Sequence, residues 1–162
     1  GPDDFYNMKK AIMPLSKSLT TRELLTFLRF TVWDSRTLLE LYNILLERIQ
    51  TEENFPKDEL AAASLKVWEY YFPIGEEGDL GYYFGSILGY LGYDNDALRF
   101  FEASLEFYGE CPETNYEIAL CYYNLQEIYK ALEYAEKALD LDPEYEESKN
   151  LKGMIVDILR EK

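Results

Sequence analysis

The sequence contains no histidine and only two cysteines, Cys111 and Cys121, among its 162 residues. Without histidine, the commonest general base and the commonest nitrogen ligand for metals are missing. On one helix the two cysteines would lie about 15 Å apart, at about 1.5 Å per residue, which is too far for a disulfide bond. We therefore predict that the chain is not an enzyme, has no metal or other cofactor, and carries free thiols in a reducing compartment, the cytoplasm.

Positive charge is scarce in the last two thirds of the chain. Residues 1–50 carry seven Lys or Arg against six Asp or Glu, whereas residues 51–162 carry nine against 25. Such a surface repels phosphate groups, which argues against nucleic acid and against an anionic membrane face as partners. An apolar protein or peptide, with or without basic residues, fits this charge. The alternative is that the acidity only keeps an apolar protein in solution.

Long uncharged segments are also absent. The longest uncharged run covers residues 80–93 and is too short to span a bilayer, so we predict no membrane insertion. Gly1 and Pro2 are typical of a protease-cleavage scar, and we treat residues 1–19 as a leader or tag remnant. The apolar run that ends this leader is interrupted by Pro14, which argues against a signal peptide.

Residues 20–77 carry apolar side chains at helical spacing. The first helix begins with a capping box, in which Glu23 follows Thr20 by three residues. A cap at Asp34 and Ser35 begins the second helix. We expect helices over about residues 20–33, 35–50 and 58–72. We interpret this region as divergent N-terminal helical hairpins.

The remainder of the chain, residues 78–162, repeats itself every 34 residues. A small residue recurs in a first helix at Gly85, Ala119 and Gly153. In the second helix the equivalent pairs are Ala97 and Ala131, Ser104 and Ala138, Leu105 and Leu139, and Phe107 and Leu141. Short polar segments separate the helices, and we predict turns at Asp94-Asn95-Asp96 and at Gln126-Glu127. A period of this length indicates a stack of helical repeats.

The second copy is the most regular. It reads Ile118-Ala119, then Tyr122, then Ala131, and residues 131–139 read Ala-Leu-Glu-Tyr-Ala-Glu-Lys-Ala-Leu before a closing Pro143. This pattern resembles the tetratricopeptide repeat family. The resemblance implies an all-α fold, a right-handed stack of antiparallel helical hairpins. Residues 78–162 would form two repeats and a polar C-terminal capping helix, in one continuous domain with residues 20–77.

In proteins of this family the first helix of each repeat lines a concave groove that binds a peptide or protein. Carried onto this sequence, the resemblance predicts a groove lined by Tyr82, Ser86, Gly89, Tyr90, Tyr116, Leu120, Tyr123, Asn124, Asn150 and Met154. Exposed aromatic side chains are typical anchors of a binding surface. The alternative is that the N-terminal helices fold into the groove and bury several of these residues.

Three glycines, Gly81, Gly85 and Gly89, recur every four residues and share one side of a helix. Each destabilises a helix interior by about 1 kcal/mol relative to alanine, so a reason for them is needed. We expect Gly85 to allow close contact between paired helices. Gly89 either serves tight packing in the same way or leaves space for the backbone of a ligand.

The sequence supports more than one function for such a module. The leading interpretation is an adaptor or assembly factor that binds a protein or peptide segment. More loosely, the size, acidity and tyrosine content resemble the tetratricopeptide-type chaperones of type III secretion translocators, which hold an apolar segment of a client. A structural oligomerisation domain is the third possibility, and the oligomeric state is left open.

Overall fold

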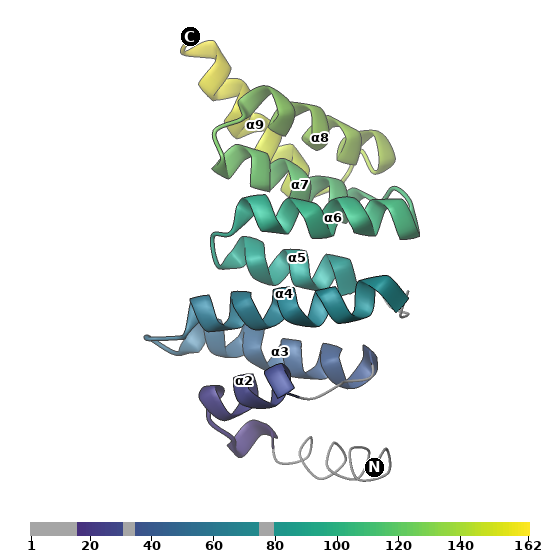
Figure 1. Ribbon diagram of the computed structural model, residues 1–162. Helices are drawn as coiled ribbons and strands as arrows, with labels where there is room; N and C mark the ends of the chain where they lie inside the picture. Colours follow the sequence, from purple (N-terminus) through teal and green to yellow (C-terminus); the bar gives the residue numbers. More distant parts are fainter. Residues whose placement is uncertain (1–15, 31–34, 75–79) are drawn as a thin grey trace. The chain divides into compact units, whose positions relative to one another are not determined.

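The computed structural model describes residues 16–30, 35–74 and 80–162, and within these ranges the chain is all-α (Figure 1). A 3-10 helix, η1 (Ser16–Ser18), precedes α2 (Thr21–Phe30), α3 (Ser35–Thr51) and α4 (Lys57–Ile74). These are followed by α5 (Leu80–Tyr90), α6 (Asp94–Tyr108), α7 (Pro112–Asn124), α8 (Ile128–Leu141) and α9 (Glu146–Arg160). The prediction of an all-α fold is confirmed. The chain divides into two compact units, residues 1–83 and 84–162.

Unit 1 confirms the three N-terminal helices within a few residues of their expected bounds. The capping box forms as predicted, because the amide of Thr20 donates to Glu23 Oε1 at 3.0 Å and the amide of Glu23 donates to Thr20 Oγ1 at 3.1 Å. These hydrogen bonds favour the charged form and hold the pKa of Glu23 below its usual value. The predicted cap at Asp34 and the predicted boundary between residues 77 and 78 lie outside the described residues.

The core of unit 1 contains buried leucines of α2, α3 and α4 and one fully buried tyrosine. Leu24 and Leu28 are spaced by four residues on α2, and both are buried. Tyr42 on α3 is fully buried, and its hydroxyl donates to the buried Ser64 Oγ on α4 at 3.0 Å. Burial raises the pKa of Tyr42, since the charged form loses its hydration. The hydrogen bond fixes how α3 faces α4.

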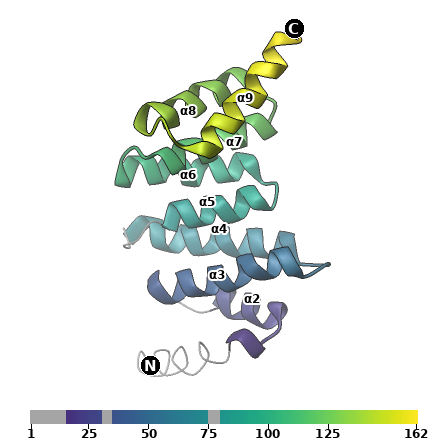
Figure 2. The ribbon, with the colours of Figure 1, turned by 180° about the vertical axis from the view of Figure 1, so that it is seen from behind.

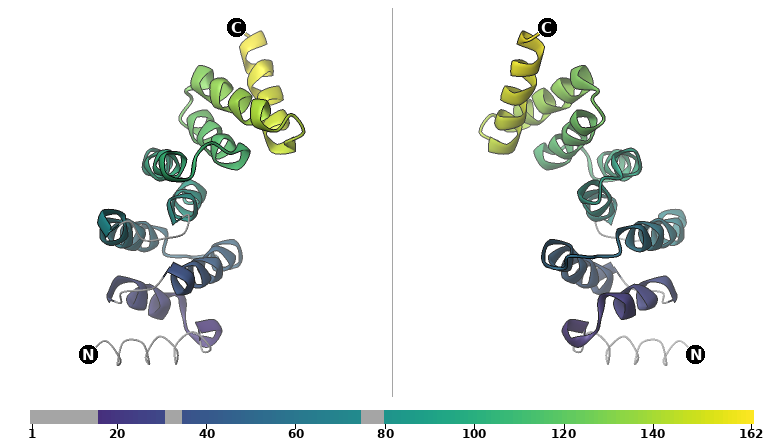
Figure 3. Two further views of the ribbon diagram at one scale, coloured as in Figure 1. Left: turned by 90° about the vertical axis from the view of Figure 1, so that its right-hand side faces the viewer. Right: turned by 90° about the vertical axis from the view of Figure 1, so that its left-hand side faces the viewer.

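Unit 2 consists of helical hairpins whose turns have the same geometry. The amide of Tyr93 donates to the carbonyl of Leu88 at 2.8 Å, and 34 residues later Glu127 donates to Tyr122 at 2.9 Å. The residue before each donor has a positive φ, 91° at Gly92 and 63° at Gln126. This is the Schellman pattern, which ends a helix with one left-handed residue. Figure 3 looks nearly along the axes of α5, α6 and α7 and shows that successive helices lie on alternate sides of the stack.

One predicted turn was wrong. Asp94-Asn95-Asp96 was expected to separate the helices of the first copy, but these residues form the first turn of α6. The turn lies at residues 91–93 instead. Acidic side chains are favoured both in turns and at helix N-termini, where they complement the helix dipole, so composition alone does not separate the two. The second predicted turn, at Gln126-Glu127, is confirmed.

Small residues bring the paired helices of unit 2 together. A side chain at Gly85 would place its Cβ only 2.7 Å from Cε1 of Phe101, a fully buried ring on α6. The expected role of Gly85 in close helix contact is therefore confirmed. In the second copy Ala119 on α7 is fully buried with Ala131 and Ala135 of α8 in one cluster.

The last helix, α9, packs with Leu151 and Ile155 into the cluster formed by α7 and α8 (Figure 2). Gly153 holds the register of Gly85, yet it is exposed, and a Cβ there would meet nothing within 4 Å. It therefore makes no close helix contact of the kind seen at Gly85. Two lysines, Lys149 and Lys152, stand on α9 in the register of the buried Asn115 and Ile118, which makes this side of the helix polar.

Candidate functional site

The first-copy residues of the predicted groove lie on α5. Tyr82 belongs to the part of α5 in unit 1, where its ring lies edge-on to Tyr83 with 6.1 Å between the centroids. Ser86 is half-buried. Tyr90, in the last turn of α5, leaves 57% of its surface exposed, more than a core residue would. Of the predicted residues on α5, Tyr90 is therefore the most accessible anchor.

Gly89 faces neighbouring helices. A Cβ built on it would lie 3.8 Å from the Cβ of Ala97 on α6 and 4.0 Å from Sγ of Cys121 on α7. These are ordinary van der Waals distances, so an added Cβ would fit against these two side chains. The contact also shows that α5 and α7 are direct neighbours in unit 2.

The second-copy residues of the predicted groove follow one side of α7. Tyr116, Leu120 and Tyr123 are spaced by four and three residues, so they form one stripe on the helix. All three are half-buried, because they pack against the cluster that contains Leu151 and Ile155 of α9. The capping helix therefore covers part of this stripe and leaves part accessible. We call the accessible side chains of α5 and α7 in this unit the inner face of unit 2. They are Ser86, Tyr90, Tyr116, Leu120, Tyr123 and Asn124.

The remaining residues predicted for the groove lie at the end of α7 and on α9. Asn124 is exposed at the end of α7, and its Nδ2 donates to Asp94 Oδ1 at 3.2 Å. Asn150 and Met154 are both exposed on α9. At the start of α9 the ring of Tyr145 meets that of Tyr116 edge to face, with centroids 5.8 Å apart. These contacts place the Asn124 amide against Asp94 and the ring of Tyr145 against Tyr116.

Carboxyl groups that sequence reasoning did not assign lie beside this stripe. Burial raises the pKa of Glu117 to about 7, so the carboxyl exchanges its proton near neutral pH. Cys121, one turn further along α7, is buried, and burial together with Asp94 and Glu117 raises the pKa of its thiol. Glu117 and Cys121 are four residues apart, so the sequence already places them on one side of a helix. Their proximity to Asp94 is visible only in the structure, where Asp94 begins α6.

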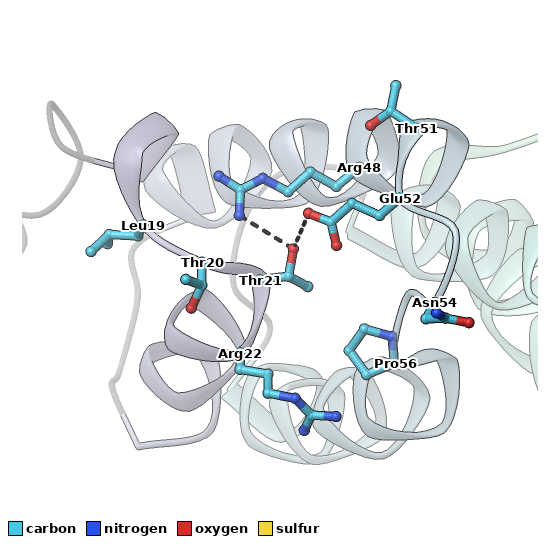
Figure 4. Close-up of a pocket in the computed structure, with 9 residues that line it drawn as sticks. All are labelled: Leu19, Thr20, Thr21, Arg22, Arg48, Thr51, Glu52, Asn54 and Pro56. Atoms are coloured by element: carbon cyan, nitrogen blue, oxygen red, sulfur yellow. Dashed lines mark hydrogen bonds between the residues drawn. The ribbon is translucent and has the colours of Figure 1, made fainter.

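A hollow of about 630 Å³ lies in unit 1 among the start of α2, the end of α3 and the loop before α4 (Figure 4). Its floor is a polar network in which Thr21 Oγ1 donates to Glu52 Oε1 at 2.7 Å and accepts from Arg48 at 3.3 Å. Arg22 forms an ion pair of 2.8 Å with Glu59 of α4. The polar groups join α2 to α3 and α4, and we interpret the hollow as a consequence of this network.

The described residues contain no group of three or more acidic, cysteine or histidine side chains that could hold a metal ion. Within the same part of the chain, no helix is both long and apolar enough to cross a membrane. Both thiols are free, with Cys111 half-buried and Cys121 buried.

Comparison with known proteins identifies the repeat. Residues 112–145 match the sequence model of the tetratricopeptide repeat, and they correspond to α7, α8 and the turn that follows. No curated protein sequence matches the chain significantly. The match to the repeat covers the more regular of the two copies found in the sequence.

Solved structures extend the likeness to nearly the whole chain. MamA, residues 41 to the end, from Desulfovibrio magneticus RS-1 is 18% identical over 94% of this chain and 82% of its own, with a TM-score of 0.60. A MamA RS-1 double mutant is 20% identical over the same shares, with a TM-score of 0.61. YrrB, described as a TPR protein with an unusual peptide-binding site, is 16% identical over 96% of this chain and 76% of its own, with a TM-score of 0.60. The chain therefore has the fold of tetratricopeptide-repeat proteins, and residues 112–145 match the repeat itself.

Proposed function

We propose that the protein is an interaction module that binds a peptide or protein segment on the inner face of unit 2. The observation that supports the proposal most directly is the exposure of Tyr90 on α5, together with the half-buried stripe of Tyr116, Leu120 and Tyr123 on the neighbouring α7. Rigid aromatic side chains that are partly accessible contribute much of the binding energy at protein interfaces. The tetratricopeptide-type fold supports this role, and YrrB provides a neighbour of the same fold with a peptide-binding site.

The partner that fits this surface is apolar, with basic residues at its margins. Apolar side chains would pack on the tyrosines, whereas Asp94 and other carboxylates of the acidic unit would attract Lys or Arg. We further propose a cytoplasmic setting and an adaptor or assembly role. The free thiols of Cys111 and Cys121 support a reducing compartment.

The experiment that tests the proposal is selection of peptides from a displayed random library on the whole chain. We expect enriched peptides with apolar or aromatic anchors, and we expect Tyr90→Ala to weaken their binding about tenfold or more, as truncation of a hot-spot aromatic does. Tyr129→Ala is the matched control, because Tyr129 is an exposed tyrosine on α8. Raising the salt concentration should lower the affinity moderately, through the charged margin.

Two results would overturn the inner face as the binding site. One is a library that yields no enriched peptide at all. The other is a set of peptides that bind Tyr90→Ala and a second variant, Tyr123→Ala, as tightly as the unmodified protein. Circular dichroism of each variant separates a loss of binding from a loss of fold, which is needed because Tyr123 packs on the core cluster.

A further inference from the structure

A second accessible apolar surface lies at one edge of unit 2, where α6 and α8 end. Phe107 and Tyr108 in the last turn of α6 leave 62% and 56% of their surfaces exposed, and Leu141 at the end of α8 leaves 47%. Phe107 and Leu141 are 34 residues apart and hold the same place in the repeat. Equivalent apolar residues of a repeat are expected to pack between helices, but here both are exposed.

The topology brings these residues to the same edge. α6 and α8 both pack against α7, and α7 runs back between their ends, so the chain leaves α6 and α8 on the same side of unit 2 (Figure 1). The turns into α7 and α9 lie there as well. Exposed apolar side chains scattered singly are normal, whereas a group of them at one edge indicates an interaction surface.

Acidic residues lie next to these apolar residues along the chain. We call residues 106–110 and 140–142 the acidic edge, since Glu106, Glu110, Asp140 and Asp142 flank the apolar side chains and are exposed or half-exposed. The ion pairs of unit 2 join Arg99 to Asp96, Lys130 to Glu127, Lys137 to Glu133, and Lys149 to Glu144 and Glu146. Within the described residues, none of the ion pairs found involves the four carboxylates of the edge, although Glu110 Oε2 accepts a hydrogen bond from Asn115 Nδ2 at 2.6 Å and Asp142 Oδ1 accepts one from the amide of Glu144 at 3.0 Å.

The helix ends make the same edge still more negative. Neither α6 nor α8 has a basic residue in its last turn, where a lysine or arginine would complement the partial negative charge of the helix end. Glu106 and Asp140 stand in those turns instead, where a carboxylate is unfavourable. Positively charged groups of another molecule would interact favourably with both helix ends and with these two carboxylates.

We propose that the acidic edge binds a basic amphipathic peptide segment, whose apolar side chains pack on Phe107, Tyr108 and Leu141 while its Lys or Arg residues pair with the surrounding carboxylates. The charge complementarity of the edge identifies this partner. The surface is distinct from the inner face, because its side chains come from the ends of α6 and α8, so the two proposals stand or fall separately.

The test uses the whole chain and a short amphipathic peptide made of leucine and lysine. NMR titration of the labelled protein should shift the backbone amides of residues 105–110 and 139–142. We expect Phe107→Ser/Leu141→Ser to weaken the binding of this peptide at least about tenfold, as loss of central apolar anchors does. Tyr90→Ala on the inner face should change it less than about twofold. The matching peptide of leucine and glutamate should not bind, because like charges face each other.

Three outcomes would overturn the proposal. The first is a set of amide shifts that cluster on α5 and α7 or are absent. The second is equal affinity of the Phe107→Ser/Leu141→Ser variant and the unmodified protein. The third is a dimer of the unmodified protein that becomes a monomer in this variant by light scattering, since the occupant of the edge would then be a second copy. Both substitutions are at exposed positions, and circular dichroism should confirm that the variant keeps its helices.

Discussion

Gly85 with Phe101 and Ala119 with Ala135 occupy the same two positions of the 34-residue repeat, but they fill the space between the helices differently. In the first copy a glycine faces a phenylalanine ring, and in the second two alanines share the space. Phe101, Ala119 and Ala135 are fully buried, and Gly85 is buried. The two residues at this contact must therefore fill the space between the helices together. Neither position requires one particular residue type.

The largest effect expected from breaking this match is that of Gly85→Leu. Even a Cβ at this position lies 2.7 to 2.9 Å from three atoms of the fully buried Phe101 ring, so the ring or the helices must shift to admit it. We expect the variant to lose the cooperative unfolding of α5 to α7, with at least about 3 kcal/mol of destabilisation. Urea unfolding followed by circular dichroism measures the loss.

Gly153→Leu is the matched control, since it makes the same substitution at the same place in the repeat. A Cβ at Gly153 meets nothing within 4 Å, so the free energy of unfolding should stay equal or rise by up to about 1 kcal/mol through helix propensity. Equal destabilisation of the two variants would show that the contact with Phe101 is not the reason for Gly85.

The next effect concerns the partner of Gly85. Phe101→Ala alone should destabilise unit 2 by about 3 to 5 kcal/mol, because it removes a buried ring and leaves a cavity. Gly85→Ala alone should destabilise it as well, through the clash with the ring. In the double variant Gly85→Ala/Phe101→Ala the pair equals that of the second copy, so its loss should be smaller than the sum of the single losses by about 1 kcal/mol or more. Additive losses in urea unfolding would mean that the two positions do not share one space.

At a second position of the repeat the equivalent residues differ in charge, whereas Gly85 and Ala119 differ only in volume. Glu117 on α7 holds the register of Leu151 on α9, which is buried. Burial raises the pKa of Glu117 to about 7 from its ordinary 4.5, so the folded state keeps a proton that the unfolded state has lost. The contribution of this group to stability is therefore full below about pH 4.5, falls as the pH rises, and reaches its lowest value above about pH 7.

Glu117→Gln removes this penalty. We expect the variant to exceed the unmodified protein in free energy of unfolding by about 2 to 3 kcal/mol at about pH 8, and the difference to shrink toward zero near pH 5. Glu136→Gln is the matched control, because Glu136 is exposed on α8 and its substitution removes the same charge. A gain that is the same at both pH values, or shared by the control, would contradict the assignment of the penalty to burial of Glu117.

The sequence predicted the helices and the repeat because these depend on local patterns. The capping box at Thr20 requires only two residues three apart, and the register of Gly85, Ala119 and Gly153 requires only counting. The role of each registered position depends instead on what packs opposite it. Gly85 and Gly153 have the same register, but only Gly85 faces a ring, because no helix in the described structure covers that side of α9.

The candidate site was predictable only in part, for the same reason. The spacing of Tyr116, Leu120 and Tyr123 places them on one stripe of α7, but the packing of α9 against that stripe decides how much of it is accessible. Phe107 and Leu141 hold equivalent positions of the repeat, and nothing in the sequence indicated that both are exposed. Exposure is a property of the assembled helices, and it does not follow from the period of the sequence.

The smallest expected effect decides between the two interpretations of Gly89 that the sequence left open. A Cβ there meets Ala97 and Cys121 at 3.8 and 4.0 Å, which are distances of ordinary contact, so Gly89→Ala should fit without strain. Alanine restricts the unfolded chain and favours the helix, and we expect a gain of about 0.5 to 1 kcal/mol in urea unfolding. Gly85→Ala, one turn earlier on α5, has the opposite expected sign, so the same substitution distinguishes a glycine required by packing from one that packing tolerates. If Gly89→Ala is more stable and still binds the selected peptides as the unmodified protein does, the residue belongs to the packing of α5 on α6 and α7. If it is more stable but no longer binds them, the missing side chain leaves space for the backbone of the ligand, and Gly89 is part of the binding surface.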